Sequence, residues 1–203
     1  MNITQAFTPS LTLVQALSQA LLRLTRWRIF GSFPALPKYI IVGAPHTSNW
    51  DFFYMLLIKG RTGVNIHWLG KDSLFRWPFG GLMKWLGGIP VNRGTRKNLV
   101  DQIVDKFQSS QELMIAVTPE GTRSKSSCWK TGFYYMALGA NVPIQLVSIS
   151  YPAHILEIGP LVTPTGDIER DFEVIKSYYS DKTGKYPEKQ GEIRVSTVVI
   201  VEP

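Results

Sequence analysis

Short apolar runs that alternate with helical segments constrain the fold of this chain more than any other feature. Runs such as Tyr39–Val42 and Leu113–Val117 are continuously apolar, as in strands that are buried on both faces of a sheet. Segments between such runs carry apolar residues at helical spacing, for example Leu99, Ile103 and Phe107. Strands that alternate with helices predict an α/β fold, with a central mostly parallel or mixed sheet that is flanked by helices.

The same patterns, followed along the chain, predict the individual elements. The predicted strands cover residues 39–42, 65–69, 89–91, 113–117, 143–150, 155–158 and 191–203. The predicted helices cover residues 11–30, 52–60, 95–109, 132–140 and 167–180. A length of 203 residues suits one domain with a sizeable core, which we place at residues 34–203. Residues 1–33 then form an N-terminal segment that contains the first helix.

The first predicted helix is amphipathic. Leu13 and Val14, Leu17, Leu21 and Leu24 recur at helical spacing, while Arg and Trp residues gather at its end. Such a helix can lie on an anionic membrane with its apolar face in the lipid, and we assign residues 1–33 this membrane-associating role. The alternative, a helix that packs on the domain through its leucine stripe, stays open.

The charge is divided unequally between the two halves of the chain. The net charge is +7, yet residues 1–100 hold 12 Lys and Arg residues and only 2 acidic residues. A basic half predicts an anionic partner: nucleic acid, anionic lipid or a phosphorylated substrate. Five of the six tryptophans lie within the first 85 residues, and Trp beside Lys and Arg is typical of a membrane interface. We therefore expect an anionic membrane surface rather than nucleic acid, for which we find no binding motif.

The sequence also excludes several classes of protein. Its single cysteine, Cys128, excludes a disulfide framework and a multi-cysteine zinc site, and three histidines are too few for a histidine-rich metal cage. No apolar run reaches the length that spans a bilayer, and the N-terminus lacks the basic start of a signal peptide. We expect a cytoplasmic protein without a metal site, bound peripherally to the cytoplasmic face of the membrane.

One candidate for catalysis is the segment His46-Thr-Ser-Asn-Trp-Asp51, which follows a predicted strand. Asp51 comes five residues after His46 at the start of a helix, so the two side chains can meet. If Asp51 accepts a hydrogen bond from Nδ1 of the imidazole, Nε2 is left as a base for a hydroxyl or a water. On spacing alone, the alternative that His46 only caps the helix stays open.

A second polar segment, Pro119–Ser124, follows another predicted strand. It combines a glycine that permits a tight turn, a guanidinium that fits phosphate, and two hydroxyls: Gly121, Arg123, Thr122 and Ser124. The glycine spacing of a P-loop or of a dinucleotide-binding fingerprint is absent. A phosphate site is therefore plausible here, and Arg93 stands at the end of a further strand.

Taken in order, four segments resemble the sequence blocks of the glycerolipid acyltransferases, above all the 1-acylglycerol-3-phosphate acyltransferases. They are HTSNWD from His46, IPVNRG around Arg93, EGTRS from Glu120 to Ser124, and VPIQLVSI at residues 142–149. Lys71 lies where the family has a lysine before the second block. The resemblance covers residues 40–150.

The resemblance implies a reaction in which an acyl group moves from a thioester to a free hydroxyl of a lysophospholipid. The donor is acyl-CoA or acyl-acyl carrier protein, no cofactor is implied, and the expected acceptor is 1-acylglycerol-3-phosphate, giving phosphatidic acid. His46 is then the general base and Asp51 orients it, without an acyl-enzyme. The resemblance further assigns substrate binding, centred on the acceptor's phosphate, to Lys71, Arg93, Glu120, Gly121, Thr122, Arg123 and Ser124.

Three alternatives stay open. Pro45 and Asn92 differ from the residues that often stand beside His46 and Arg93 in the family, so another lyso-lipid or a non-glycerol acceptor is the first. The same His–Asp pair can activate water, which makes a thioesterase the second. A non-catalytic binding module is the third, although such a module needs neither the His–Asp pair nor the EGTRS segment.

Overall fold

The computed structural model describes residues 12–91 and 99–195. The strands in these residues are β1 (Arg28–Phe30), β2 (Lys38–Ala44), β3 (Ile66–Lys71), β4 (Gly88–Val91), β5 (Leu113–Val117), β6 (Ile144–Ser150) and β7 (Ile155–Val162). The α-helices are α1 (Leu13–Leu24), α2 (Trp50–Thr62), α3 (Gly80–Trp85), α4 (Leu99–Ser109), α5 (Gly132–Ala140) and α6 (Ile168–Tyr179). Two short 3-10 helices are η1 (Asp72–Phe75) and η2 (Pro187–Lys189).

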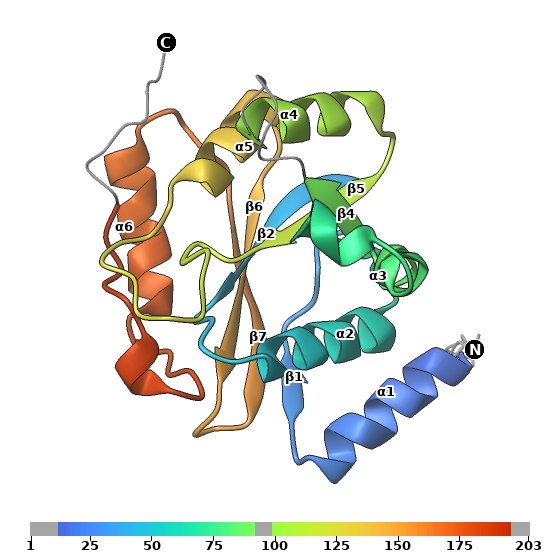
Figure 1. The fold of residues 1–203 in the computed structure, drawn as a ribbon. Helices are drawn as coiled ribbons and strands as arrows, with labels where there is room; N and C mark the ends of the chain where they lie inside the picture. Colours follow the sequence, from blue (N-terminus) through green and yellow to red (C-terminus); the bar gives the residue numbers. More distant parts are fainter. Residues whose placement is uncertain (1–11, 92–98, 196–203) are drawn as a thin grey trace, which may run out of the picture.

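The strands form a single sheet in the order β1-β7-β6-β2-β5-β3-β4 (Figure 1). Neighbouring strands run parallel, except that β6 and β7 are antiparallel. The predicted α/β class with a mostly parallel sheet is therefore confirmed. Because β2 lies between β6 and β5, the segments that follow these three strands emerge at the same edge of the sheet.

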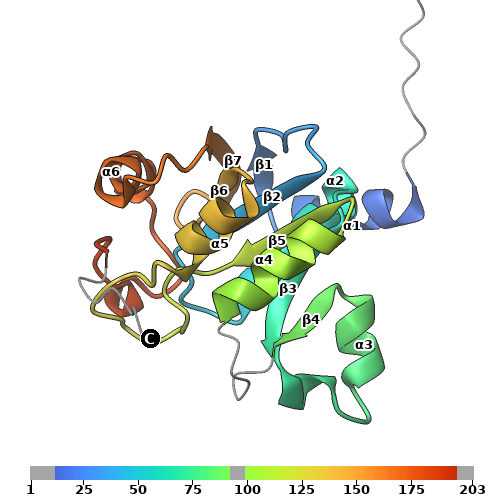
Figure 2. The same cartoon turned by 90° about the horizontal axis from the view of Figure 1, so that it is seen from above.

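Helices cover both faces of the sheet, which Figure 2 shows from above. Ile40 and Val42 of β2 face one core, to which α4, α5 and α6 contribute. Tyr39 and Ile41 face a second core, which includes residues of α1 and α2. Successive side chains of a strand point to opposite faces, so a strand buried on both sides needs a continuous apolar run. This explains the unbroken apolar segment that predicted β2.

The first helix is shorter than the sequence predicts. We expected a helix over residues 11–30, but α1 ends at Leu24 and the chain then enters β1, which pairs with β7. Arg26 has a left-handed backbone with φ of 60°, and Trp27 is buried against Tyr54. Burial of the indole turns the chain out of the helix, so the basic and aromatic end of the predicted helix is a turn and an edge strand instead.

Helix α1 packs on α2 through a face that the leucine spacing did not indicate. Ser18 and Leu22 are its buried residues, and Ser18 lies against Gly60, where an added Cβ would lie 2.2 Å from Oγ of Ser18. Leu13 is 86% exposed, and Leu17 and Leu24 are exposed as well. Of the leucine stripe, Leu21 packs against the second core, so packing on the domain, one of the two alternatives, is confirmed in part, while most of the stripe faces outward.

Several predictions concern residues outside the described ranges. The start of the helix expected at residues 95–109 and most of the strand expected at 191–203 lie there, although Val195 forms a parallel bridge with Trp129. The division of the chain at residue 33 stays a prediction. Within the described residues, no helix has the length and apolarity to span a bilayer.

Candidate active site

Two polar loops meet at one edge of the sheet because the strands that precede them are parallel neighbours. Val42 of β2 pairs with Val117 of β5, so the loop that starts at His46 and the loop that contains Glu120 begin side by side. Such an edge, at the carboxyl ends of parallel strands, is where α/β sheets commonly bind ligands. The two loops that we selected in the sequence therefore belong to one site.

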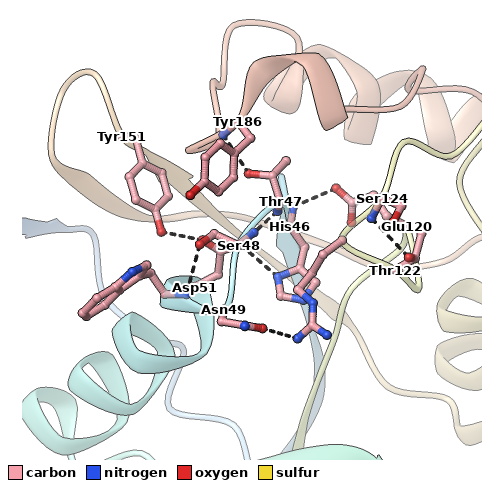
Figure 3. A network of polar contacts seen from close by, with 12 residues as sticks. His46, Thr47, Ser48, Asn49, Asp51, Glu120, Thr122, Ser124, Tyr151 and Tyr186 are labelled. Carbon is pink, nitrogen blue, oxygen red and sulfur yellow. Dashed lines mark hydrogen bonds and ion pairs between the residues drawn. The ribbon is translucent and has the colours of Figure 1, made fainter.

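The loop after β2 folds back so that Asp51 reaches His46 (Figure 3). Nδ1 of His46 lies 3.0 Å from Oδ2 of Asp51. The backbone amides of Thr47 and Ser48 donate to the same oxygen, at 3.0 and 2.9 Å. Asp51 occupies the first turn of α2, where the helix dipole favours a negative charge. With Nδ1 as donor, Nε2 carries the lone pair, which is the arrangement of an oriented general base.

The second oxygen of Asp51 has a partner from a distant part of the chain. Oη of Tyr151, which follows β6, donates to Oδ1 of Asp51 at 2.6 Å (Figure 3). Burial and the neighbouring Asp51 raise the pKa of Tyr151 far above its ordinary value. The phenol therefore keeps its proton and remains a donor to the carboxylate.

Glu120 holds the backbone of the loop that carries His46. Its Oε1 accepts a hydrogen bond from the backbone amide of His46 at 3.0 Å, and the residue is only 5% exposed. The other oxygen, Oε2, is buried without a hydrogen-bond partner among the described residues. Burial raises the pKa of this carboxyl above its ordinary value, because the charged form is poorly solvated there.

Two basic side chains gather beside the dyad. Nη1 of Arg123 donates to Oδ1 of Asn49, which ties the loop after β5 to the start of α2. Gly121 has a left-handed backbone with φ of 64°, and a Cβ there would lie 3.1 Å from Nζ of Lys130. The ammonium of Lys130 thus lies over a glycine that the turn requires. Arg123 and Lys130 both line the same cavity as His46.

This cavity has a volume of about 640 Å³ and is mostly apolar away from the two polar loops. His46 and Asp51 line it, and so does Gly43 of β2. Its apolar lining includes Phe33, Ile41, Met55, Ile58, Ile66 and Leu156. A cavity of this size and character fits a ligand with a long apolar part and a polar end.

The chain also matches known proteins in sequence and in fold. The sequence pattern of a family described as Acyltransferase matches residues 32–150, which include both polar loops. The chain belongs to the Acyltransferase family. The match begins at residue 32, after α1 and β1, and ends with the last residue of β6.

This acyltransferase-family chain is similar in sequence to two bacterial 1-acyl-sn-glycerol-3-phosphate acyltransferases. It is 30% identical over 125 residues to the 1-acyl-sn-glycerol-3-phosphate acyltransferase of Escherichia coli, a match that covers 58% of this chain and 49% of that enzyme. It is 33% identical over 107 residues to the Haemophilus influenzae enzyme of the same name, over 49% of this chain and 42% of that one. The chain thus matches about half of each relative's length or less.

A solved structure shares the fold of this acyltransferase-family chain. The 1-acyl-sn-glycerophosphate (LPA) acyltransferase PlsC from Thermotoga maritima superposes with a TM-score of 0.58 at 19% sequence identity. The match covers 85% of this chain and 80% of that structure. At this level of identity, the likeness shows the fold alone.

The remaining residues that the sequence singled out are spread around the site. Lys71 ends β3 at the same edge of the sheet and is exposed, but it does not line the cavity. Thr122 and Ser124 are exposed on the turn, where Oγ1 of Thr122 accepts from the amide of Ser124 at 3.2 Å. Arg93 lies outside the described residues. Within the described part of the chain, no three His, Cys, Asp or Glu residues could together hold a metal ion.

Sequence reasoning missed two residues of the site in this acyltransferase-family chain. Tyr151 lies 100 positions from Asp51 and stands in none of the four blocks, so no local pattern points to their contact. Lys130 follows the EGTRS segment closely, and its basic charge was a signal that the sequence offered. Only the fold shows that Lys130 returns over Gly121.

Proposed function

We propose that this chain is an O-acyltransferase that moves a fatty acyl group from an acyl-thioester to the free hydroxyl of a lysophospholipid. The proposed acceptor is 1-acylglycerol-3-phosphate, and the product is phosphatidic acid. Membership of the Acyltransferase family and the names of the two bacterial relatives support the reaction class.

One observation carries the proposal: an oriented His–Asp pair and two cations line the same largely apolar cavity. A phosphorylated lyso-lipid presents a hydroxyl, an anion and an acyl chain, and each has a chemical counterpart in this cavity. His46 is the base for the hydroxyl, Arg123 and Lys130 suit the phosphate, and the apolar lining suits an acyl chain.

The chemistry requires one base and no covalent enzyme intermediate. Nε2 of His46 takes the proton as the acceptor's hydroxyl oxygen attacks the thioester carbonyl. The new C–O bond forms, the C–S bond breaks, and the imidazolium returns its proton to the leaving thiolate. Asp51 holds the imidazole in the required tautomer and stabilises its positive charge during the transfer.

The phosphate of the acceptor is proposed to bind at the loop after β5. Arg123 supplies a planar pair of donors, and Lys130 supplies a compact charge. Lys71 and Arg93 would extend this basic edge, while Gly121, Thr122 and Ser124 shape the turn. Glu120 acts indirectly: its carboxyl accepts a hydrogen bond from the backbone amide of His46 and is too buried to approach a phosphate.

The chain is further proposed to act on an anionic membrane surface, at its cytoplasmic face. Trp77, which precedes α3, is 94% exposed, and Trp85, the last residue of α3, is 79% exposed. The same segment also carries Arg76 and Lys84. Together with the exposed leucines of α1, these side chains have the composition of a surface that enters the lipid headgroup layer.

The reaction is tested by incubating the purified full chain with a labelled acyl-CoA or acyl carrier protein thioester. Each donor is offered with a panel of lyso-lipids, and the products are identified by mass spectrometry. We expect a diacyl product with 1-acylglycerol-3-phosphate. Transfer to a different acceptor would keep the mechanism and change the substrate. Free fatty acid in every reaction, without any diacyl product, would contradict transfer and indicate a thioesterase.

A further inference from the structure

The carboxylate of Asp51 is held from two sides by different parts of the chain. Its own loop supplies the donors to Oδ2, namely the imidazole of His46 and the amides of Thr47 and Ser48. The donor to Oδ1 is the phenol of Tyr151, which comes from the end of β6. The loop that carries His46 follows β2, and β2 is the neighbour of β6 in the sheet. The contact therefore depends on the register between these two strands.

The ring of Tyr151 is fixed in this position by its surroundings. Its backbone amide donates to the carbonyl of Thr183 at 3.1 Å. The ring packs edge-on against Trp27 and Tyr54, with centroid separations of 5.1 and 6.1 Å. Such aromatic contacts hold a ring in one orientation. The hydroxyl of this packed ring is aimed at Asp51.

We propose that Tyr151 is a positioning residue for the general base: it fixes the Asp51 carboxylate so that Oδ2 faces the imidazole of His46. This inference rests on the proposed acyl transfer and deepens it. A carboxylate that is clamped at both oxygens cannot turn about its Cβ–Cγ bond. The imidazole that depends on it then keeps its orientation and its tautomer.

The hydrogen bond has an electrostatic consequence as well. A donor on Oδ1 draws carboxylate charge away from the imidazole, so the protonated form of His46 is stabilised less than by a carboxylate without that donor. Removal of the phenol should therefore let Asp51 stabilise the protonated imidazole more strongly, so that Tyr151→Phe needs a higher pH than the wild type to reach full activity. This direction follows because the phenol offsets part of the negative charge of Asp51, and that negative charge stabilises the positive imidazolium.

Other charged groups lie around the dyad, so the test must separate them from Tyr151. Glu120 reaches the backbone of His46 from the loop after β5. Arg123 is hydrogen-bonded to Asn49, and the ammonium of Lys130 lies over Gly121. Nζ of Lys185 lies 6.0 Å from the centre of the Tyr151 ring. A variant that removes only the Tyr151 hydroxyl leaves all these charges in place.

The experiment compares Tyr151→Phe with Tyr54→Phe in the full chain. Tyr54 belongs to the same aromatic cluster, so its variant loses a hydroxyl there without changing a donor to Asp51. Initial rates are measured with the acyl-thioester and lyso-lipid pair that the wild type uses. In parallel, the histidine ring signals are titrated by NMR, and the His46 signal is assigned by its loss in His46→Gln.

We expect Tyr151→Phe to lower kcat about tenfold with little change in either KM, because it removes one hydrogen bond to a charged carboxylate. The acidic limb of its pH profile and the titration of His46 should both move to higher pH. Tyr54→Phe should show neither change. An unchanged kcat in Tyr151→Phe would overturn the proposal, as would an unmoved His46 titration or equal effects from Tyr54→Phe.

The NMR titration also separates this inference from the proposed function. If the wild type transfers no acyl group but Tyr151→Phe still shifts the His46 titration, the proposed reaction fails and the positioning contact stands. If transfer occurs and the titration does not shift, the reaction stands and the role of Tyr151 is wrong. Thermal unfolding of both variants checks that each one is folded.

Discussion

Arg123 donates a hydrogen bond from Nη1 to the side-chain oxygen of Asn49, across 74 positions of sequence. The contact links the loop after β5 to the residue that precedes α2, and so places a guanidinium beside the His46–Asp51 pair. The same guanidinium lines the cavity that His46 lines. We propose that this cation selects substrates by their phosphate.

We predict that Arg123→Ala raises the KM for the acceptor by about 10-fold to 100-fold, because one charge-assisted hydrogen bond is worth roughly 1.5 to 3 kcal/mol. The KM for the acyl donor should change much less. Steady-state kinetics with each substrate varied in turn measures both constants, and Arg170→Ala on α6 is the matched control. An equal rise in both constants would contradict a role in phosphate binding.

Replacement of His46 by alanine should remove the base and lower kcat by a factor of between about 100 and 10,000. Asp51→Asn should have a similar effect, since an amide can no longer hold the imidazole as the carboxylate does. Binding to anionic vesicles, followed by sedimentation, should survive in both variants. Retained turnover in His46→Ala would disprove the mechanism.

A side chain added at Gly43 should change the preference for acyl chain length. A Cβ at this position meets nothing nearer than the carbonyl oxygen of Val117 at 4.0 Å, and the residue lines the cavity. Gly43→Val should therefore fold and narrow the apolar part of the cavity. We expect kcat/KM to fall more for long-chain than for short-chain substrates, with Gly43→Ala intermediate. An equal loss at all chain lengths would place the acyl chain elsewhere.

The buried carboxyl of Glu120 should make stability depend on pH. Its pKa is raised in the folded protein, so the folded state binds this proton more tightly than the unfolded state does. The resulting stabilisation is complete below the ordinary glutamate pKa and is lost as the pH rises through the raised value. Thermal unfolding should be measured across this pH range for the wild type and for Glu120→Gln. The difference in melting temperature between the two proteins should shrink or reverse as the pH rises. A difference in melting temperature that stays constant with pH would contradict the raised pKa of Glu120.

Two exposed tryptophans should contribute to membrane binding but not to the chemistry. Trp77→Ser with Trp85→Ser should weaken binding to vesicles of anionic phospholipid by at least about tenfold, since each indole loses apolar area that the lipid would bury. Turnover of detergent-dispersed substrate should stay the same. Val174→Ser on α6 removes an exposed apolar side chain elsewhere and serves as the control. Unchanged vesicle binding in the double variant would exclude this surface.

The sequence patterns predicted the strands at the centre of the sheet well, and the first helix poorly. Segments such as 113–117 and 132–140 coincide with β5 and α5, because apolar run length and helical spacing are local signals. The end of α1 depends instead on the burial of Trp27 against Tyr54, which comes from α2. A tertiary contact of this kind overrides helix propensity and leaves no trace in the local pattern.

The sequence by itself determined the α/β class, the polar loop at His46–Asp51 and the loop at Glu120–Ser124, because each depends on residues close together in the chain. The tertiary structure decided how they combine. Parallel pairing of β2 with β5 brings the loops together, the neighbouring β6 supplies Tyr151 to Asp51, and burial turns Glu120 toward the backbone of His46. These contacts join residues 74 and 100 positions apart, and only the pairing of strands brings such residues within hydrogen-bond distance.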